Sequence, residues 1–196
     1  MVEKGIVRQI LVDQREEIDI LLKRCGVERE CEASVAQGLS DKLIKVITGV
    51  RRCGKSALAH RVLRGLSYGY VNFDDERLFS VAAADLNTIL EVLLELRPDL
   101  QLILLDEIQN IEGWELFVNR LQRQGYRVML TGSNAHLLGR ELATHLTGRH
   151  RVYEVYPYSF REYLRAHGYV EKGQPARSTR ENARLSALFA DYFLKG

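Results

Sequence analysis

The sequence predicts a three-layer α/β/α fold with a parallel five-stranded core sheet, and two observations lead to this prediction. Five short apolar segments alternate with segments of helical periodicity between residues 43 and 156. Each apolar segment is a near-continuous run rather than a polar–apolar alternation, which is typical of strands buried on both faces of a parallel sheet. Right-handed crossovers then place the connecting helices on each face of that sheet.

Residues 1–40 are predicted to form a helical leader. Apolar residues at positions 7, 10, 11, 18, 21, 22 and 25 share one face of a helix whose other face is charged. Residues 28–40 are small and polar, and they indicate a second, weaker helix or a connector. We expect the leader to pack on its own domain, although the same apolar face could pack on another subunit.

Residues 41–165 are predicted to form the core domain. The apolar runs predict strands at residues 43–48, 68–73, 101–105, 127–131 and 152–156. Helices are predicted at residues 56–66, 86–96, around 114–121 and around 137–146. Pro98 ends the second of these helices, because proline cannot continue a helix interior.

Residues 166–196 are predicted to form a loop and a C-terminal helix. Helical segments at about 159–167 and 182–195 are separated by the polar stretch VEKGQPARSTR, which we interpret as a surface loop. We expect this region to be the start of a C-terminal part that is truncated or missing.

The composition argues against a disordered chain, collagen-like repeats and highly charged tails. Apolar residues make up 46% of the 196 residues and charged residues 28%, which is ordinary for a soluble globular domain. The 28 basic and 26 acidic residues leave a net charge of +2, so net charge does not indicate a nucleic-acid or membrane-surface partner. We expect free thiols at Cys25, Cys31 and Cys53. No signal-peptide core or membrane span is visible, and we expect a cytoplasmic protein.

The most specific motif is GVRRCGKS at residues 49–56, which matches the phosphate-binding pattern G-x-x-x-x-G-K-[ST]. A predicted strand precedes it and a predicted helix follows it, which is the context that this Walker A loop requires. Its glycines let successive backbone N–H groups surround phosphate oxygens at a helix N-terminus. The predicted nucleotide-binding residues are Gly49, Val50, Arg51, Arg52, Cys53, Gly54, Lys55, Ser56 and Ala57.

Three side chains are predicted to bring the phosphates and a magnesium ion together. Lys55 would reach the β and γ phosphates, and the Ser56 hydroxyl would bind Mg²⁺, a cation that prefers oxygen ligands. A second magnesium ligand is expected at the carboxyl end of an apolar strand. Asp106, at the end of LILLD, is our choice for this Walker B position, directly or through water.

Glu107 separates two classes of enzyme. Hydrolysis needs a carboxylate that orients or deprotonates an attacking water, whereas a small-molecule kinase uses a substrate hydroxyl for that attack. The pair Asp106-Glu107 therefore favours an ATPase, although a solvated glutamate at a helix start would look the same. Asp74 and Asp75, after the neighbouring strand, are second-choice carboxylates for the site, and paired acids are also common in loops.

Two further polar positions are candidates for sensing the γ phosphate. Ser133 and Asn134 follow the strand at residues 127–131, where an amide could contact the phosphate or the water. A turn or helix cap at Asn134 explains it equally well. Arg149 is the best candidate for a catalytic cation, within its own chain or toward a neighbouring subunit, unless it only pairs with a surface acid.

The remaining charged and histidine residues carry weaker signals. Arg51 and Arg52 lie inside the loop, where side chains tend to point away from the phosphates, and we interpret them as positioning or partner contacts. The histidines offer no ligand-spaced pair beyond His145 and His150, so a histidine metal site is not expected.

Together, ITGVRRCGKS, VNFDDERL, LDEIQNIEGWELFVNRL and LTGSNAHLLGRELATHLTGR resemble the prokaryotic, archaeal-type AAA-like P-loop ATPase family. The resemblance covers residues 43–163. It implies the additional-strand catalytic-glutamate branch, in which the strand before Ser133 and Asn134 lies between the phosphate-loop strand and the Asp106 strand. It also implies ATP as the nucleotide and a separate C-terminal domain after residue 196.

Three functions compete at this stage. The first is a Mg-dependent ATP-hydrolysing molecular switch, with a homo-oligomer as a possible assembly. The second is a nucleotide-dependent binding module without significant turnover, acting in a nucleic-acid or defence system. The third, a small-molecule kinase, is weakened by Glu107 and by the lack of an arginine-rich substrate lid.

Overall fold

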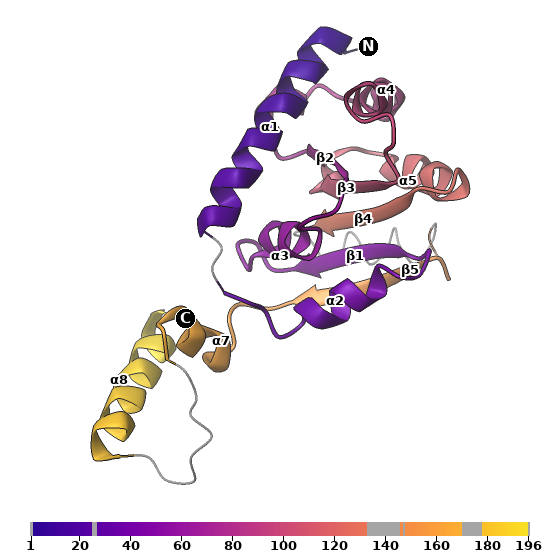
Figure 1. Cartoon of the computed structure of the whole chain (residues 1–196). Coiled ribbons are helices and arrows are strands. Elements are labelled where there is room, and N and C mark those ends of the chain that lie inside the picture. Colours follow the sequence, from indigo (N-terminus) through magenta and orange to yellow (C-terminus); the bar gives the residue numbers. More distant parts are fainter. Residues whose placement is uncertain (1, 25–26, 133–145, 147, 170–177, 196) are drawn as a thin grey trace.

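The computed structural model describes residues 2–24, 27–132, 146, 148–169 and 178–195, and it has the predicted three-layer α/β architecture (Figure 1). The sheet has five parallel strands in the order β2-β3-β4-β1-β5. Their bounds are β1 Ile44–Gly49, β2 Gly69–Asn72, β3 Leu102–Asp106, β4 Arg127–Gly132 and β5 His150–Val155.

The strand order also agrees with the order that the family resemblance implies. β4 pairs with β1 on one side and with β3 on the other, so it lies between the phosphate-loop strand and the Asp106 strand. Because all five strands are parallel, their carboxyl ends meet at one edge of the sheet. This edge is where the candidate functional site lies.

Each strand of the sheet centre contributes side chains to both faces. Along β3, Ile103 and Leu105 belong to one buried apolar cluster, whereas Leu102 and Leu104 belong to the other. This alternation follows from the period of two in a β-strand. Since both faces are buried, the strand has no polar face, and it therefore appears in the sequence as a continuous apolar run.

Helices cover both faces of the sheet, and the buried apolar cluster is larger on one face than on the other. On one face lie α4 Leu86–Leu96 and α5 Trp114–Arg123, whose apolar residues join the larger cluster. On the other face lie α2 Glu32–Gly38 and α3 Lys55–Val62. Short 3₁₀ turns, Glu76–Leu78, Ala83–Asp85 and Ile108–Asn110, follow β2, precede α4 and follow β3.

Helix α1, Lys4–Arg24, lies along the β2 edge of the sheet and contacts both α4 and α3 (Figure 1). Gln14 is fully buried there. Its amide nitrogen donates to the backbone oxygen of Asn72 at 3.0 Å, and its amide oxygen accepts from the Asn72 N–H at 3.0 Å. The side chain therefore occupies backbone groups that an edge strand leaves unpaired.

After β5 the chain continues into α7, Phe160–Ala166, and α8, Thr179–Lys195, which lie beside the β5 end of the molecule (Figure 1). Ser159 and Glu162 form a capping box, in which each side chain accepts a hydrogen bond from the backbone N–H of the other. Aromatic contacts join the two helices, with Phe160 packed edge-on against Phe189 at a centroid distance of 5.1 Å.

The boundaries differ from the sequence prediction in small ways. The helix predicted to reach residue 66 ends at Val62, and Gly65 then adopts a left-handed φ of 83°. The helix predicted around residues 137–146 falls almost wholly outside the described residues. Cys31 and Cys53 carry free thiols, while Cys25 is not among the described residues. No described helix is both long and apolar enough to span a membrane.

We expect the stability of this fold to depend on pH through His60, which is fully buried on α3 and hydrogen-bonded through Nδ1 to the Tyr68 hydroxyl at 2.9 Å. Burial, helped by the nearby Arg15 charge, lowers the pKa of His60 from 6.5 to about 4. Between these values the unfolded chain binds a proton that the folded chain does not, so stability falls as the pH falls. From pH 7.5 to pH 4 the free energy of unfolding should drop by about 3 kcal/mol more for the wild type than for His60→Gln.

Urea unfolding at both pH values measures this difference. Equal pH dependence in the wild type and in His60→Gln would show that the His60 imidazole does not carry it.

Candidate functional site

A cavity of about 600 Å³ lies at the carboxyl edge of the sheet. The loop after β1 and the first turn of α3 form one wall, and the ends of β2 and β3 form the other. Leu21 of α1 also reaches it. The loop and strand-end residues that line it are Arg51, Arg52, Gly54, Lys55, Ser56, Ala57, Asn72, Asp74, Asp106, Glu107, Gln109 and Asn110.

The loop holds a conformation that depends on glycine and on one strained residue. Arg52 and Gly54 both have left-handed φ values, 66° and 92°. Alternating handedness in successive residues turns backbone N–H groups toward one concave side, which makes an anion-binding nest. At Gly49, a Cβ atom would lie 2.0 Å from the backbone oxygen of Val155, so only glycine fits between the loop and β5.

Lys55 bridges the loop and the acid after β3. Its ammonium group is buried and donates to the backbone oxygens of Val50 at 3.1 Å and Gly49 at 3.4 Å. The Nζ atom also lies 3.7 Å from Oε1 of Glu107. The structure thus places the Lys55 ammonium group beside the Glu107 carboxylate.

Asp106 is the most enclosed acid of the site, with 3% of its surface exposed. Three hydroxyl groups donate to its carboxylate: Ser56 Oγ at 3.0 Å and Thr131 Oγ1 to one oxygen, and the Tyr70 hydroxyl at 3.2 Å to the other. Burial raises the pKa of Asp106, and the Thr131 and Ser56 hydrogen bonds oppose that rise.

The predicted magnesium ligands, Ser56 and Asp106, are therefore in direct contact. They are hard oxygen donors, and Mg²⁺ is commonly bound by one or two protein oxygens plus phosphate and water. The described residues contain no group of three or more histidine, cysteine or acidic side chains placed for a metal. Ser56 and Asp106 could hold such an ion together with phosphate and water ligands.

Glu107 is held by its backbone as well as by its side chain. It has a left-handed φ of 52°, which is uncommon for a residue other than glycine and often marks a functional site. Its N–H donates to Thr131 Oγ1 at 3.1 Å, and its Oε2 accepts from the Gln109 amide at 2.6 Å. The adjacent acids Asp106 and Glu107 thereby face different surroundings, one buried under hydroxyls and one beside the lysine.

The two second-choice carboxylates, Asp74 and Asp75, lie in different surroundings. Asp74 lines the cavity, is exposed, and lies 3.8 Å from the Arg51 guanidinium. Asp75 instead binds Arg77 and the Gln14 amide, and Arg77 lowers its pKa to about 2. Asp75 is therefore tied to α1 and to its own turn rather than to the cavity.

The other candidates lie elsewhere. Ser133, Asn134 and His145 fall outside the described residues. Arg149 is exposed at the amino end of β5, where its backbone oxygen accepts from the Ile44 N–H at 2.9 Å. The phosphate-binding loop follows the carboxyl end of β1, so Arg149 and the loop lie at opposite edges of the sheet.

Sequence reasoning missed several residues that shape the site. Tyr70 and Thr131 bind the Asp106 carboxylate from neighbouring strands, and Gln109 binds Glu107. A hydroxyl residue inside an otherwise apolar run was the available signal in both strands. That signal could not identify a partner, because the partners are 25 and 36 residues away in the chain.

A family model described as an AAA domain matches residues 41–164. An uncharacterized protein of Methanocaldococcus jannaschii is 33% identical over 200 residues, which cover 100% of this chain and 43% of that protein. An uncharacterized protein of Haemophilus influenzae is 38% identical over 133 residues, covering 63% of this chain and 33% of that protein. The chain therefore spans less than half the length of these curated relatives.

Among solved structures, the Aeropyrum pernix ORC1 protein, determined in complex with DNA, matches with a TM-score of 0.52 and 17% sequence identity. The match covers 76% of this chain and 52% of that chain. At this level of identity, the similarity supports the fold alone.

The Thr131 hydroxyl should matter for stability as well as for the site. Thr131→Val leaves an oxygen of the buried Asp106 and the Glu107 N–H without this partner, so the free energy of unfolding should fall by about 1–3 kcal/mol. Urea unfolding measures the change.

Thr48→Val is the matched control on β1. Its hydroxyl is buried and has no hydrogen-bond partner among the described residues, so this variant should be neutral or slightly more stable. Equal losses in the two variants would contradict the assigned role of Thr131.

Proposed function

This chain belongs to the AAA domain family and carries a P-loop nucleotide-binding module, and on that premise we propose that it binds Mg-ATP, hydrolyses it and acts as a molecular switch. The observation that carries the proposal is the 3.0 Å contact between the Ser56 hydroxyl and the Asp106 carboxylate beneath the phosphate-binding loop. Two oxygen donors from the first turn of α3 and the end of β3 meet there, and the next residue, Glu107, is an acid facing Lys55.

The phosphate groups would be held by the loop and by Lys55. Loop N–H groups at the N-terminus of α3 favour an anion, because the helix dipole adds to their partial charges. Lys55 Nζ currently donates to loop carbonyls, and it would exchange these for phosphate oxygens without leaving the loop. Ser56 and Asp106 would hold Mg²⁺, which neutralises charge on the phosphate oxygens when it is bound.

Glu107 is the residue proposed to act on water. Hydrolysis requires that a water oxygen attack the γ phosphorus, that the bond to the β-phosphate oxygen break, and that a base take or orient the water proton. The Glu107 carboxylate is only partly buried and lines the cavity. Its left-handed backbone and the Thr131 hydrogen bond fix its direction.

A binding module without significant turnover is the second candidate, and one observation favours it. Both oxygens of Glu107 already face groups of the chain, the Lys55 ammonium at 3.7 Å and the Gln109 amide at 2.6 Å. These two contacts restrict the directions from which the Glu107 carboxylate can accept a proton from water. A nucleic-acid or protein partner, or a part of the relatives that this chain does not span, would then be needed to release it.

The position of Arg149 favours a role between chains. Since it lies at the amino edge of the sheet, opposite the loop, we propose that it reaches the nucleotide of a second copy of this chain. An arginine supplied by a neighbour stabilises the charge that develops on the transferred phosphoryl group.

Glu107→Gln should separate hydrolysis from binding. We expect phosphate release from Mg-ATP to fall by about 100-fold or more, because the amide cannot accept the water proton, while ATP affinity stays close to that of the wild type. Phosphate release is measured for both proteins at equal nucleotide occupancy. Glu112→Gln, an exposed acid outside the cavity, is the control.

If the wild type retains ATP but neither protein releases phosphate, the binding module is correct and the hydrolase is wrong. Phosphate transfer that requires an added acceptor would instead support a kinase.

Arg149→Ala should lower turnover on the order of a thousandfold if the arginine acts between chains. Mixing Arg149→Ala with Glu107→Gln chains should then restore activity, since each chain supplies the group that the other lacks. Turnover assays on the separate and mixed proteins test this, with Arg151→Ala as the neighbouring control. No recovery on mixing would contradict a role between chains.

A further inference from the structure

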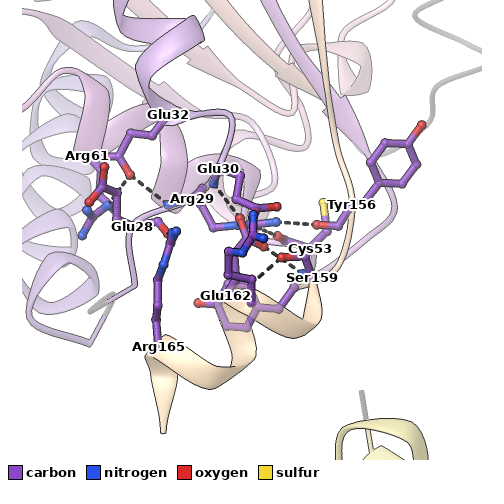
Figure 2. A network of polar contacts seen from close by, with 12 residues as sticks. Glu28, Arg29, Glu30, Glu32, Cys53, Arg61, Tyr156, Ser159, Glu162 and Arg165 are labelled. Carbon is purple, nitrogen blue, oxygen red and sulfur yellow. Dashed lines mark hydrogen bonds and ion pairs between the residues drawn. The ribbon is translucent and has the colours of Figure 1, made fainter. Parts of the chain in front are cut away.

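Arg29 is a buried cation behind the phosphate-binding loop, and neither the motif nor the proposed chemistry accounts for it. It lies between α1 and α2, with 7% of its surface exposed. Figure 2 shows its guanidinium beside the loop at Cys53 and beside the segment that carries Tyr156 and Glu162. Its ion-pair partner, Glu162, is 3% exposed, and Oε1 of Glu162 lies 2.9 Å from Arg29 Nε.

One arm of the guanidinium holds the loop itself. Arg29 Nη1 donates to the backbone oxygen of Cys53 at 2.8 Å. In a trans peptide the C=O and the next N–H point in opposite directions, and the described chain has no cis peptide. The bond to Cys53 therefore turns the Gly54 N–H away from Arg29 and toward the opposite side of the loop.

Gly54 is also shaped by this contact. A Cβ atom at residue 54 would come within 3.3 Å of Arg29 Nη1, and the residue has a left-handed φ of 92°. Arg29 thus packs directly against the turn that leads into Lys55 and Ser56. Any displacement of Arg29 changes the support of the loop at that turn.

The other two arms hold the segment that leads into α7. Arg29 Nη2 donates to the Tyr156 backbone oxygen at 2.6 Å, and Nε donates to Glu162 (Figure 2). Glu162 also accepts from the Glu30 N–H at 2.7 Å and, through the capping box, from the Ser159 N–H at 2.9 Å. Despite burial, these hydrogen bonds and the Arg29 charge hold the pKa of Glu162 below its usual value.

The same segment leads on to α8. The Arg29 guanidinium lies 4.9 Å from the centre of the Tyr158 ring, and the backbone oxygen of Tyr158 accepts from the Tyr192 hydroxyl of α8 at 2.8 Å. On α7, the Tyr163 hydroxyl donates to Asp191 of α8 at 2.5 Å. Arg29 and the segment from Tyr156 to Tyr163 therefore connect the loop to α8.

We propose that Arg29 is a positioning residue for the phosphate-binding loop and that the Arg29–Glu162 pair couples this loop to α7 and α8. The planar fork of arginine reaches the loop, the strand end and the helix cap at once, which a point charge such as lysine cannot do. Occupancy of the loop thereby changes the packing of α7 and α8. This proposal rests on nucleotide binding at the loop, as proposed above.

Arg29→Lys tests the proposal without leaving Glu162 as a buried, unpaired charge. Urea unfolding first establishes that the variant is folded. Calorimetric titration with Mg-ADP should then give a Kd about tenfold or more above that of the wild type, because the charge-assisted bond to Cys53 and the fork are lost. In turnover, KM should rise similarly while kcat changes by less than about twofold, whereas a partly unfolded sample would lower kcat and leave KM unchanged.

Amide hydrogen exchange tests the coupling. Saturating Mg-ADP should change the exchange of α7 and α8 in the wild type, and this change should disappear in Arg29→Lys. Arg165→Gln is the matched control. Arg165 also joins α7 to the segment before α2, by donating to the Glu28 backbone oxygen at 3.3 Å. Within the described part of the chain it makes no hydrogen bond or ion pair with the loop. It should keep the Kd and the nucleotide-dependent change of the wild type.

An unchanged Kd in Arg29→Lys, or identical α7 and α8 exchange in the free and saturated wild type, would overturn the proposal. If the wild type binds no Mg-ADP, the proposed function fails. Amide exchange of the nucleotide-free wild type and of nucleotide-free Arg29→Lys then tests the coupling. Exchange should then be faster in Arg29→Lys than in the wild type, both in the loop and in α7. Unchanged exchange in both segments would contradict the coupling.

Discussion

The buried carboxylate of Asp106 is the constraint on which the centre of this structure depends. A charge with so little solvent contact needs hydrogen-bond donors, because water no longer solvates it. Its donors come from α3, from β2 and from β4, so a single acid joins the helix after the phosphate-binding loop to two neighbouring strands. Thr131 also accepts from the Glu107 N–H, which extends the same network to the adjacent acid.

Buried polar side chains also attach the segments outside the central sheet. Gln14 fixes α1 to the edge strand β2 through the backbone of Asn72, and Arg29 fixes the segment before α2 to the loop and to α7. These contacts are directional, so they determine how the segments sit in a way that apolar packing alone does not.

The site combines a firmly held loop with a pair of acids in different surroundings. Gly49 and Gly54 allow the close approach of β5 and of Arg29, while Asp106 and Glu107 are separated by burial and by hydrogen bonding. A metal ligand needs to stay in place, whereas a group that acts on water needs solvent access. The lower exposure of Asp106 and the higher exposure of Glu107 agree with the roles proposed for them.

The sequence by itself determined the layers, the phosphate-binding motif and the candidate acids, because each depends on local periodicity or on adjacent residues. The run LILLD and the motif GVRRCGKS can be recognised from the local sequence, without knowledge of which residues pack against them. Strand boundaries moved by a residue or two, since hydrogen bonding to neighbouring strands decides where a strand ends.

Only the tertiary structure decided which distant residues meet. Arg29 and Glu162 are 133 residues apart, and Tyr70 and Asp106 are 36 apart. The insertion of β4 between β1 and β3 brings Thr131 to Asp106, and parallel pairing sends Arg149 to the far edge from the loop. Such contacts depend on the strand order and on the crossovers between strands. Local residue patterns do not specify either of these.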